Sequence, residues 1–455
     1  MNFFTRDRSF YRSLVALAIP VALQNLITFA VSFADNVMVS SLGDSAVSGV
    51  YMANQIQTFL QMFSGGIEAT IMIMAAQYWG KRDTDSIKSI VSIGIRISAA
   101  VGLILNLLCL VMPSVILSAL TKDASVISDG STYLRIVCFS YVFFCITQSL
   151  IAAMRSVEIA KVGMYVSACS LFINVGLNYV LIFGKLGFSP MGLKGAAIAT
   201  LISRIAEFIL VYIYTLLFDK RLGMRLKDLL YTDKVVTRSF IKYALPVVSG
   251  NIVWSINLMA NSAILGRFPK EVISAVSVAN TMNSLAYITI NGMSSAIGII
   301  TGKTVGAGKT ELIKEYARTT QILFILLGIL TSIIIFAIKA PFIALYSGIS
   351  SDAAIYSGQF ITVLAITSIG TSYQAACLAG LVKAGGDVGF VFKNDTIFVF
   401  LVVIPSALIA LNAGASAWVV FACLKCDQIL KCIVAYFKIN SFNWIKDISK
   451  ANKEA

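Results

Sequence analysis

One acidic residue stands alone in a long apolar stretch near the N-terminus. Asp35 lies in the run 14–40, which has no other charged residue between Arg12 and Asp44. An ionised carboxylate in such surroundings costs several kcal/mol unless it finds a partner, a proton or a metal ion. We therefore expect Asp35 to bind and release a small cation. The alternative is a structural hydrogen bond across helices to an Asn or Ser side chain.

Polar residues of two later apolar runs could complete a cation site. Asn174 and Asn178 are four residues apart, so they share one face of a helix. Thr200 falls at a depth similar to that of Asn178 when its own run is counted at about 1.5 Å per residue. The sequence predicts a coupling site of Asp35, Asn174, Asn178 and Thr200 for H⁺ or Na⁺, with Asp35 and Asn174 as possible Na⁺ ligands. For each asparagine taken singly, bonding between helices is the simpler interpretation.

The composition indicates that these residues lie in a membrane protein. Of 455 residues, 58% are hydrophobic and only 13% are charged, whereas a water-soluble domain has about a quarter charged residues. Each apolar stretch is long enough for a hydrocarbon core of about 30 Å. We predict an all-α integral membrane protein with twelve transmembrane helices, at approximately 14–40, 47–78, 88–118, 127–154, 161–183, 194–218, 239–266, 272–302, 312–345, 353–382, 387–411 and 414–437.

The basic residues predict the orientation in the membrane. Of 36 lysines and arginines, 26 fall in alternate loops and in a C-terminal tail counted from Lys431, and six fall in the opposite loops. Arg155 and Lys383 belong to the larger set. This bias predicts cytoplasmic termini and a multi-pass protein of the cell membrane. Since these residues are not gathered on one face, we expect no nucleic-acid partner.

The two halves of the chain resemble each other at an offset of 226 residues. An internal repeat across six spans predicts two lobes of parallel orientation, 1–218 and 238–455, joined by a basic cytoplasmic linker, 219–237. Asp35 aligns with Asn261, so the first lobe alone carries the intramembrane acid. Matching pairs include Pro20/Pro246, Asn25/Asn251, Ala34/Ala260, Ser48/Ser274, Asn54/Asn280, Gly66/Gly292 and Gly80/Gly306.

The chain resembles the multidrug and toxic compound extrusion (MATE) family. The resemblance rests on AIPVALQNLITFAVSFADNVMVSSLG in the first span, NVGLNYVLIFGKLGFSPMGLKGAAIAT in the fifth and sixth, and the repeated plan. It implies two six-helix lobes related by pseudo-two-fold symmetry. It also implies export of organic, often cationic and lipophilic compounds against inward H⁺ or Na⁺. Carried over by motif, the family's first-span acid is Asp35 and a nearby first-span amide is Gln24. The fifth-span pair is then Asn174 and Asn178, and the sixth-span hydroxyl is Thr200.

The chain departs from the family pattern in the second lobe. Where many members have a seventh-span acid this chain has Trp254, and where one branch has a tenth-span acid it has Ser372 and Tyr373. One branch has Asp at the position of Asn178. Coupling is therefore expected to rest on Asp35.

Several residues are candidates for a substrate cavity. Flexible methionines suit a cavity for varied lipophilic molecules, and Glu68 is a second acid within a span, for which pairing between helices is the alternative. Arg204 and Glu207, three residues apart, are predicted to neutralise each other, whereas Lys425 and Asp427 do not share a helix face. The predicted cavity residues are Gln24, Met38, Asn54, Glu68, Trp254, Asn261 and Tyr373.

Other functions are less consistent with the sequence. A lipid-linked oligosaccharide flippase of the same superfamily is the main alternative. An intramembrane enzyme is disfavoured because the sequence has no histidine, no zinc-binding spacing and no GxSxG motif. It has no P-loop and no obvious channel filter. We expect a monomer that is not an enzyme, with small organic substrates and the bilayer as partners and no cofactor beyond the coupling ion.

Overall fold

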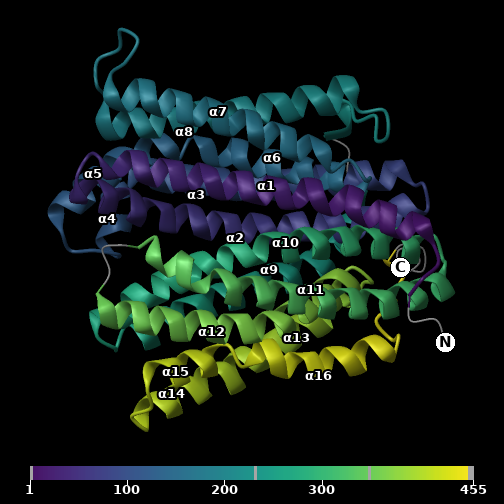
Figure 1. The fold of residues 1–455 in the computed structure, drawn as a ribbon. Helices are drawn as coiled ribbons and strands as arrows, with labels where there is room; N and C mark the ends of the chain where they lie inside the picture. The colour runs from purple at the N-terminus through teal and green to yellow at the C-terminus, as the bar shows by residue number, and fades with distance from the viewer. Residues whose placement is uncertain (1–3, 230–232, 347–349, 449–455) are drawn as a thin grey trace. The chain divides into compact units, whose positions relative to one another are not determined.

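The computed structural model is helical throughout the residues that it describes, 4–229, 233–346 and 350–448 (Figure 1). Short turns connect most of the helices, and the shorter helices are pieces of interrupted spans. The α-helices are α1 (Arg8–Ser40), α2 (Asp44–Gly80), α3 (Thr84–Val111), α4 (Pro113–Ser118), α5 (Ala124–Val137), α6 (Ser140–Ser156), α7 (Lys161–Phe183), α8 (Gly192–Ile213), α9 (Lys234–Leu265), α10 (Lys270–Gly306), α11 (Thr310–Ala344), α12 (Ser351–Gln374), α13 (Val388–Ile397), α14 (Ile404–Asn412), α15 (Ala417–Leu424) and α16 (Asp427–Asn440).

The twelve predicted spans correspond to these helices with two irregularities. Within the described part of the chain, ten helices are long and apolar enough to cross a membrane. The predicted span 127–154 is the pair α5 and α6, which bends by 53° at its junction. The predicted span 414–437 is divided between α15 and α16, which are interrupted at Lys425 and Cys426. The chain is thus a multi-pass membrane protein.

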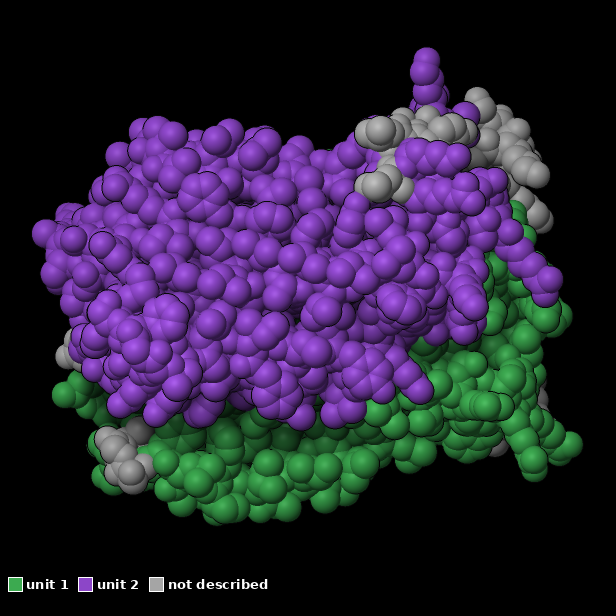
Figure 2. Space-filling model, turned by 90° about the horizontal axis from the view of Figure 1, so that it is seen from above, with its two compact units in different colours: residues 1–22, 76–81, 245–455 green, residues 23–75, 82–244 purple. Residues whose placement is uncertain are grey.

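The helices form two compact units, which Figure 2 marks in different colours. Unit 1 consists of residues 1–22, 76–81 and 245–455, and unit 2 of residues 23–75 and 82–244. The chain passes from unit 2 to unit 1 within α9, between Ala244 and Leu245. The predicted lobes, 1–218 and 238–455, rest on the internal repeat and not on contacts within the fold, and they stay a prediction.

Unit 2 is built around the pairing of α7 with α8 and of α3 with α6. Gly195 allows α8 to approach α7 closely, since a Cβ atom there would lie 2.7 Å from the carbonyl oxygen of Leu181. Small residues at such crossings are how membrane helices pack tightly. This pairing brings the polar residues of the fifth and sixth predicted spans together.

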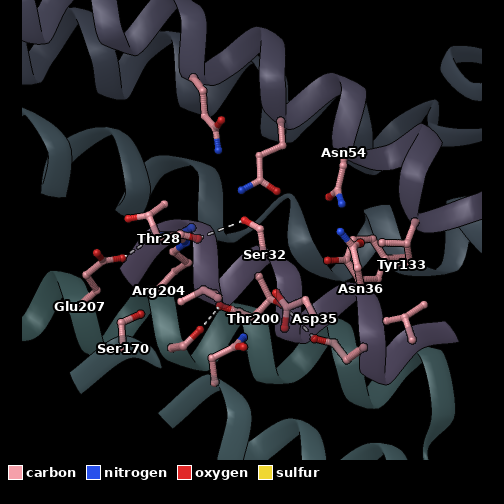
Figure 3. Close-up of a pocket in the computed structure, with 18 of the residues that line it drawn as sticks. Thr28, Ser32, Asp35, Asn36, Asn54, Tyr133, Ser170, Thr200, Arg204 and Glu207 are labelled. Atoms are coloured by element: carbon pink, nitrogen blue, oxygen red, sulfur yellow. Dashed lines mark hydrogen bonds and ion pairs between the residues drawn. The ribbon is translucent and has the colours of Figure 1, made fainter. Parts of the chain in front are cut away.

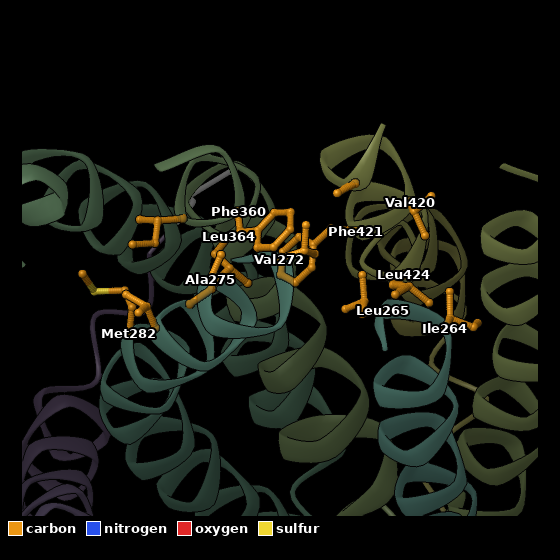
Figure 4. Packing of buried hydrophobic residues seen from close by; sticks show 14 of the residues in the cluster. Ile264, Leu265, Val272, Ala275, Met282, Phe360, Leu364, Val420, Phe421 and Leu424 are labelled. Carbon is orange, nitrogen blue, oxygen red and sulfur yellow. The ribbon is translucent and has the colours of Figure 1, made fainter. Parts of the chain in front are cut away.

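Unit 1 has an apolar core formed by α10, α12 and α15 (Figure 4). The rings of Phe360 and Phe421 are stacked with their centroids 4.5 Å apart, and both side chains are buried. Figure 4 shows Val272 and Leu364 beside them. The stacking ties α15 to α12 and so holds the interrupted last span in place.

Two segments of unit 1 are wound as π-helices rather than α-helices. One, η3 (Ala375–Lys383), continues α12, and the other, η4 (Phe398–Val403), separates α13 from α14. A shorter π segment, η1 (Tyr214–Phe218), ends α8 in unit 2. Such segments are rare and are frequent at functional sites, because the wider turn redirects side chains.

The described start of the predicted linker, residues 219–229, contacts α3 of unit 2. Its short 3₁₀ turn, η2 (Leu226–Leu229), ends at a carbonyl group that accepts hydrogen bonds from Ser92 Oγ at 2.6 Å and from Arg96 Nη2 at 2.9 Å. Asp228 and Lys88 form an ion pair at 3.5 Å. Arg96, one of the charges predicted within a span, thus serves to hold the linker against α3.

Candidate functional site

Unit 2 encloses a polar cavity of about 180 Å³. Figure 3 shows side chains from several helices of this unit gathered around it. The volume is below the roughly 300–1,000 Å³ of pockets for drug-sized ligands, so the cavity suits a small cation or one charged group of a larger molecule. Its lining includes Thr28, Ser32, Asp35, Asn36, Asn54, Gln57, Gln61, Tyr133, Ser170, Asn174, Thr200, Arg204 and Glu207.

Asp35 is held in this cavity by an amide of α7. Asn178 Nδ2 donates to Asp35 Oδ1 at 2.5 Å and to Asn174 Oδ1 at 3.2 Å. Both asparagines are buried, each with a relative exposure of 1%. The i, i+4 spacing of the two asparagines places their amides on one helix face, where one amide can bridge to the other and to α1. The structure therefore brings the predicted Asp35, Asn174 and Asn178 together.

Thr200 lies in the same cavity but is bonded within its own helix. Its hydroxyl donates to the Ala196 carbonyl oxygen at 3.0 Å, which leaves the hydroxyl oxygen able to accept a hydrogen bond or a cation. Asn54 of α2 also lines the cavity. The predicted cation-coupling residues are thus neighbours, and Asn54 is the one predicted substrate-cavity residue that joins them.

The other two charges of this cavity neutralise each other, as predicted from their spacing. Arg204 Nη1 donates to Glu207 Oε2 at 2.7 Å, and the guanidinium group of Arg204 lies over the Phe144 ring. Asp35 makes no ion pair with any residue in 4–229, 233–346 or 350–448. The lining therefore contains one negative charge that no cationic side chain contacts directly.

The donor atoms fit a small cation only in part. The described residues contain no group of three or more His, Cys, Asp or Glu side chains that could hold a metal ion. Oxygen ligands are available from Asp35 and Thr200, but Asn178 presents its nitrogen to the carboxylate. Its Oδ1 atom is buried without a hydrogen-bond partner. A Na⁺ ion bound by all of these residues would require the Asn178 amide to rotate.

Unit 1 has a second cavity of about 200 Å³, formed by α9, α10, α12, η3, α13, η4 and α16. The predicted substrate residue Trp254 lines it together with Tyr287. Three charged side chains also line it, Lys383, Asp395 and Lys431, beside the amides of Gln374 and Gln428. Sequence reasoning overlooked this set, because its members come from three separate helices.

Lys431 belongs to this cavity rather than to the C-terminal tail, so counting it with the tail was wrong. Its ammonium group lies 3.0 Å from Asp395 Oδ1 and 3.0 Å from Asp427 Oδ2. The side chain of Asp427 is 1% exposed, and Gln428 Nε2 donates to it as well. Asp427 and Lys431 are four residues apart, and this i, i+4 spacing was the signal that could have identified the pair.

The remaining predicted cavity residues lie elsewhere. Gln24 is buried in unit 2 and accepts a hydrogen bond from Arg155 Nη2 at 2.6 Å. Arg155 was counted among loop residues, but the structure places it at the end of α6. Glu68 accepts a hydrogen bond from Ser64 Oγ at 3.2 Å, and Met38 packs against the apolar core of unit 2.

Two predicted cavity residues of the second half are also outside both polar cavities. Asn261 lies in α9, and its Oδ1 atom is buried without a hydrogen-bond partner. The Tyr373 hydroxyl donates to Gln321 Oε1 at 2.8 Å, and Tyr373 lines a largely apolar groove between α11, α12 and α16. The seven residues predicted for one substrate cavity are therefore dispersed.

The chain matches the model of the MatE family twice, over residues 20–180 and 246–409. The two matched segments begin at Pro20 and Pro246, the same pair that the internal alignment places in register. The double match covers well over half of the chain. It agrees with a repeat of one ancestral half.

Curated relatives carry names that refer to drug resistance. The chain is 26% identical to a protein of Thermotoga maritima named "Probable multidrug resistance protein NorM", over 74% of this chain and 72% of the relative. A protein of the same name from Halalkalibacterium halodurans is 24% identical over 88% and 87%. A Bacillus subtilis protein named "Probable multidrug resistance protein YoeA" is 23% identical over 84% and 82%.

Solved structures share the fold at low sequence identity. A MATE protein crystallised in complex with MaL6 superposes with a TM-score of 0.85 at 17% identity, covering 97% of both chains. The eukaryotic MATE transporter AtDTX14 superposes with a TM-score of 0.81 at 19% identity, covering 98% of this chain and 99% of AtDTX14. This twelve-span membrane protein belongs to the MatE family and has the MATE fold.

Proposed function

We propose that this protein is a secondary active multidrug exporter. It exchanges organic, often cationic and lipophilic compounds for H⁺ or Na⁺ that moves inward through Asp35. The observation that carries the proposal is the single unpaired carboxylate in the polar cavity of unit 2, held by the Asn178 amide. The names of the curated relatives supply the substrate class.

The chemistry of this cavity explains an exchange. Arg204 and Glu207 cancel, so the lining retains one negative charge that can be neutralised in two ways. Either a small cation binds Asp35, or the positive group of an organic compound approaches it. Each excludes the other, because a second positive charge would find no counter-charge. Competition for one carboxylate therefore couples the two movements, provided that the cation binds the two transport states with different affinity.

The hydrogen bonds favour H⁺ over Na⁺ as the coupling ion. A proton on Asp35 Oδ2 leaves Oδ1 free to keep accepting from Asn178 Nδ2. Sodium binding would need the Asn178 amide to present its oxygen in place of its N–H group. It would also need Asn174 Oδ1 as a ligand, and that atom already accepts a hydrogen bond from Asn178. Proton loading thus preserves the observed network, whereas Na⁺ loading has to rearrange it.

The test is efflux of a cationic dye from vesicles that contain the purified protein, under a pH gradient or a Na⁺ gradient imposed separately. We expect efflux to follow the pH gradient and Asp35→Asn to abolish it. An asparagine keeps the size and an oxygen acceptor but can neither ionise nor take up a proton. Efflux by Asp35→Asn equal to that of the parent would overturn the proposal.

A matched control separates this effect from a general loss of acidic charge. Asp85 is an exposed acid in the first turn of α3, outside the cavity. Asp85→Asn should transport like the parent. If the Na⁺ gradient alone drove efflux, exporter function and the role of Asp35 would stand. The proposal that H⁺ is the coupling ion would be wrong.

A further inference from the structure

The polar cavity of unit 1 contains a charged group that the exporter mechanism does not use. Lys383 lines this cavity, and neither a hydrogen bond nor an ion pair of its side chain is found among the described residues. Lys431, by contrast, contacts two carboxylates at 3.0 Å each. Asp395 is close enough to interact electrostatically with Lys383, but its direct contact is with Lys431, so the ammonium group of Lys383 makes no direct ion pair.

A lysine at the end of a membrane helix often extends its amine to the aqueous interface. Here the C-terminal segment covers that end of the helix. The Trp444 ring lies directly against Gly385, two residues beyond Lys383, and the backbone N–H of Lys446 donates to the Gly385 carbonyl oxygen at 2.7 Å. Trp444 is fully buried. Lys383 is only partly exposed, and its side chain lines the cavity.

Lys383 also lies where the backbone departs from α-helical geometry. It is the last residue of the π-helix η3, and the second π-helix, η4, contributes Val399 to the same lining. Two π-helical segments at one cavity are unusual, since such segments are rare and are frequent at functional sites. A charged lysine inside a membrane span costs roughly 2.5–3.5 kcal/mol on insertion scales, and at Lys383 no direct carboxylate contact offsets this cost, because Asp395 contacts Lys431 instead.

The rest of the lining suits an aromatic ring. Trp254 and Tyr287 provide ring faces, and Leu378 and Val391 provide apolar contacts. Gln374 offers an amide beside them. At about 200 Å³ the cavity is smaller than a typical drug pocket, so it accommodates one ring system with its acidic substituent. A positively charged substituent would instead meet two ammonium groups and the single carboxylate of Asp395.

We infer that the unit 1 cavity is a binding site for an aromatic carboxylate, either an organic anion or the acidic end of a zwitterionic compound, with Lys383 as its counter-charge. The inference deepens the proposed function, since such a compound would be a substrate of the exporter. Binding itself needs no ion gradient. It can therefore be measured independently of transport.

The test is calorimetric titration of the purified full-length protein in detergent with three probes that share the naphthalene ring system. The probes are 2-naphthoate, its neutral methyl ester and the 2-naphthyl-trimethylammonium ion. We expect the parent to bind the carboxylate at least about tenfold more tightly than the other two, as a charge-assisted hydrogen bond provides. Lys383→Met should remove this preference and Lys383→Arg should retain most of it.

Lys393→Met is the matched control, because Lys393 is exposed on α13 and outside the cavity lining. It should bind 2-naphthoate like the parent. The inference is overturned if Lys383→Met keeps the preference for the carboxylate, or if the parent binds the ester equally well. Preferential binding of the ammonium probe would also overturn it and would point to Asp395.

Asp35→Asn separates this inference from the proposed function. The variant should bind 2-naphthoate with parental affinity even though it has lost gradient-driven efflux. If Asp35→Asn still exports the dye while Lys383→Met loses carboxylate binding, the proposed coupling fails and the binding site stands. If instead Asp35→Asn loses dye efflux while Lys383→Met keeps its preference for the carboxylate, the proposed coupling stands and the binding site is excluded.

Discussion

The two polar cavities are similar in size but differ in which charged side chain makes no direct ion pair. In unit 2, Arg204 pairs with Glu207, and the carboxylate of Asp35 remains. In unit 1, Lys431 serves two carboxylates, and the ammonium group of Lys383 remains. In each cavity most charged side chains form direct ion pairs, and one charged side chain forms none. Pairing therefore distinguishes the candidate functional charge from its neighbours better than burial does.

The same comparison shows how a repeated fold can diverge. Asp35 aligns with Asn261, so the acid of the first half has no counterpart at the equivalent position. The charged residues of the second half come instead from η3, α13 and α16. A duplicated scaffold constrains where helices run. It leaves free which helix faces carry charge.

The largest effect is expected on removing Lys431. Lys431→Met leaves the buried carboxylate of Asp427 and the partly exposed carboxylate of Asp395 without their cation, and breaking a buried pair costs about 3–5 kcal/mol. The midpoint of thermal unfolding in detergent should fall markedly. Lys383→Met, in the same cavity, should unfold close to the parent. Equal destabilisation by the two substitutions would contradict the division into charges that form direct ion pairs and charges that form none.

A second contrast applies within unit 2. Glu207→Gln removes the partner of Arg204 and should destabilise the protein by about 2–3 kcal/mol, less than a fully buried pair, because Arg204 reaches the cavity. Asp35→Asn should leave the unfolding midpoint nearly unchanged and abolish gradient-driven efflux. A thermally unstable Asp35→Asn protein would mean that Asp35 has a structural role.

The hydrogen bond to Asp35 can be tested by itself. Asn178→Leu removes the donor at 2.5 Å, and losing a hydrogen bond to a charged group costs about 1.5–3 kcal/mol. We expect the initial rate of proton-driven dye efflux to fall about tenfold or more, with protein still inserted in the membrane. Asn440→Leu changes an exposed asparagine of α16 and should have no effect. If Asn178→Leu exports the dye at the parental rate, the Asn178 amide has no role in the mechanism.

The smallest effect concerns a charged cluster outside the spans. Burial raises the pKa of Asp387, but hydrogen bonds from Lys438 at 2.7 Å and Lys446 at 2.9 Å outweigh it and hold that pKa below its usual value. A depressed folded-state pKa contributes stability above the unfolded value of about 3.9. That stability is lost as the pH falls through the folded-state pKa.

Asp387→Asn should therefore lower the unfolding midpoint slightly at pH 7, by the equivalent of about 1 kcal/mol. The difference from the parent should shrink progressively below about pH 4. Unlike the cavity charges, this cluster should affect neither dye efflux nor 2-naphthoate binding. If the difference in unfolding midpoint between the parent and Asp387→Asn grew on acidification, the lowered folded-state pKa assigned to Asp387 would be wrong.

Some properties of this protein follow from the sequence alone. Hydropathy, the distribution of basic residues and the internal repeat predicted a twelve-span membrane protein, because each depends on local composition or on register along the chain. The i, i+3 spacing of Arg204 and Glu207 likewise predicted their pair, and the isolation of Asp35 singled it out. The i, i+4 spacing of Asn174 and Asn178 anticipated a shared face.

Other properties were decided only by the tertiary structure. That Lys431 also contacts Asp395, that Gln24 binds Arg155, and which way the Asn178 amide turns all depend on helices that are distant in sequence. An apolar span gives no signal of which neighbour it will face, since lipid and protein offer similar surroundings to its side chains. Lys383 could therefore be read as a loop residue from its position in the chain, until the packed helices enclosed it in a cavity.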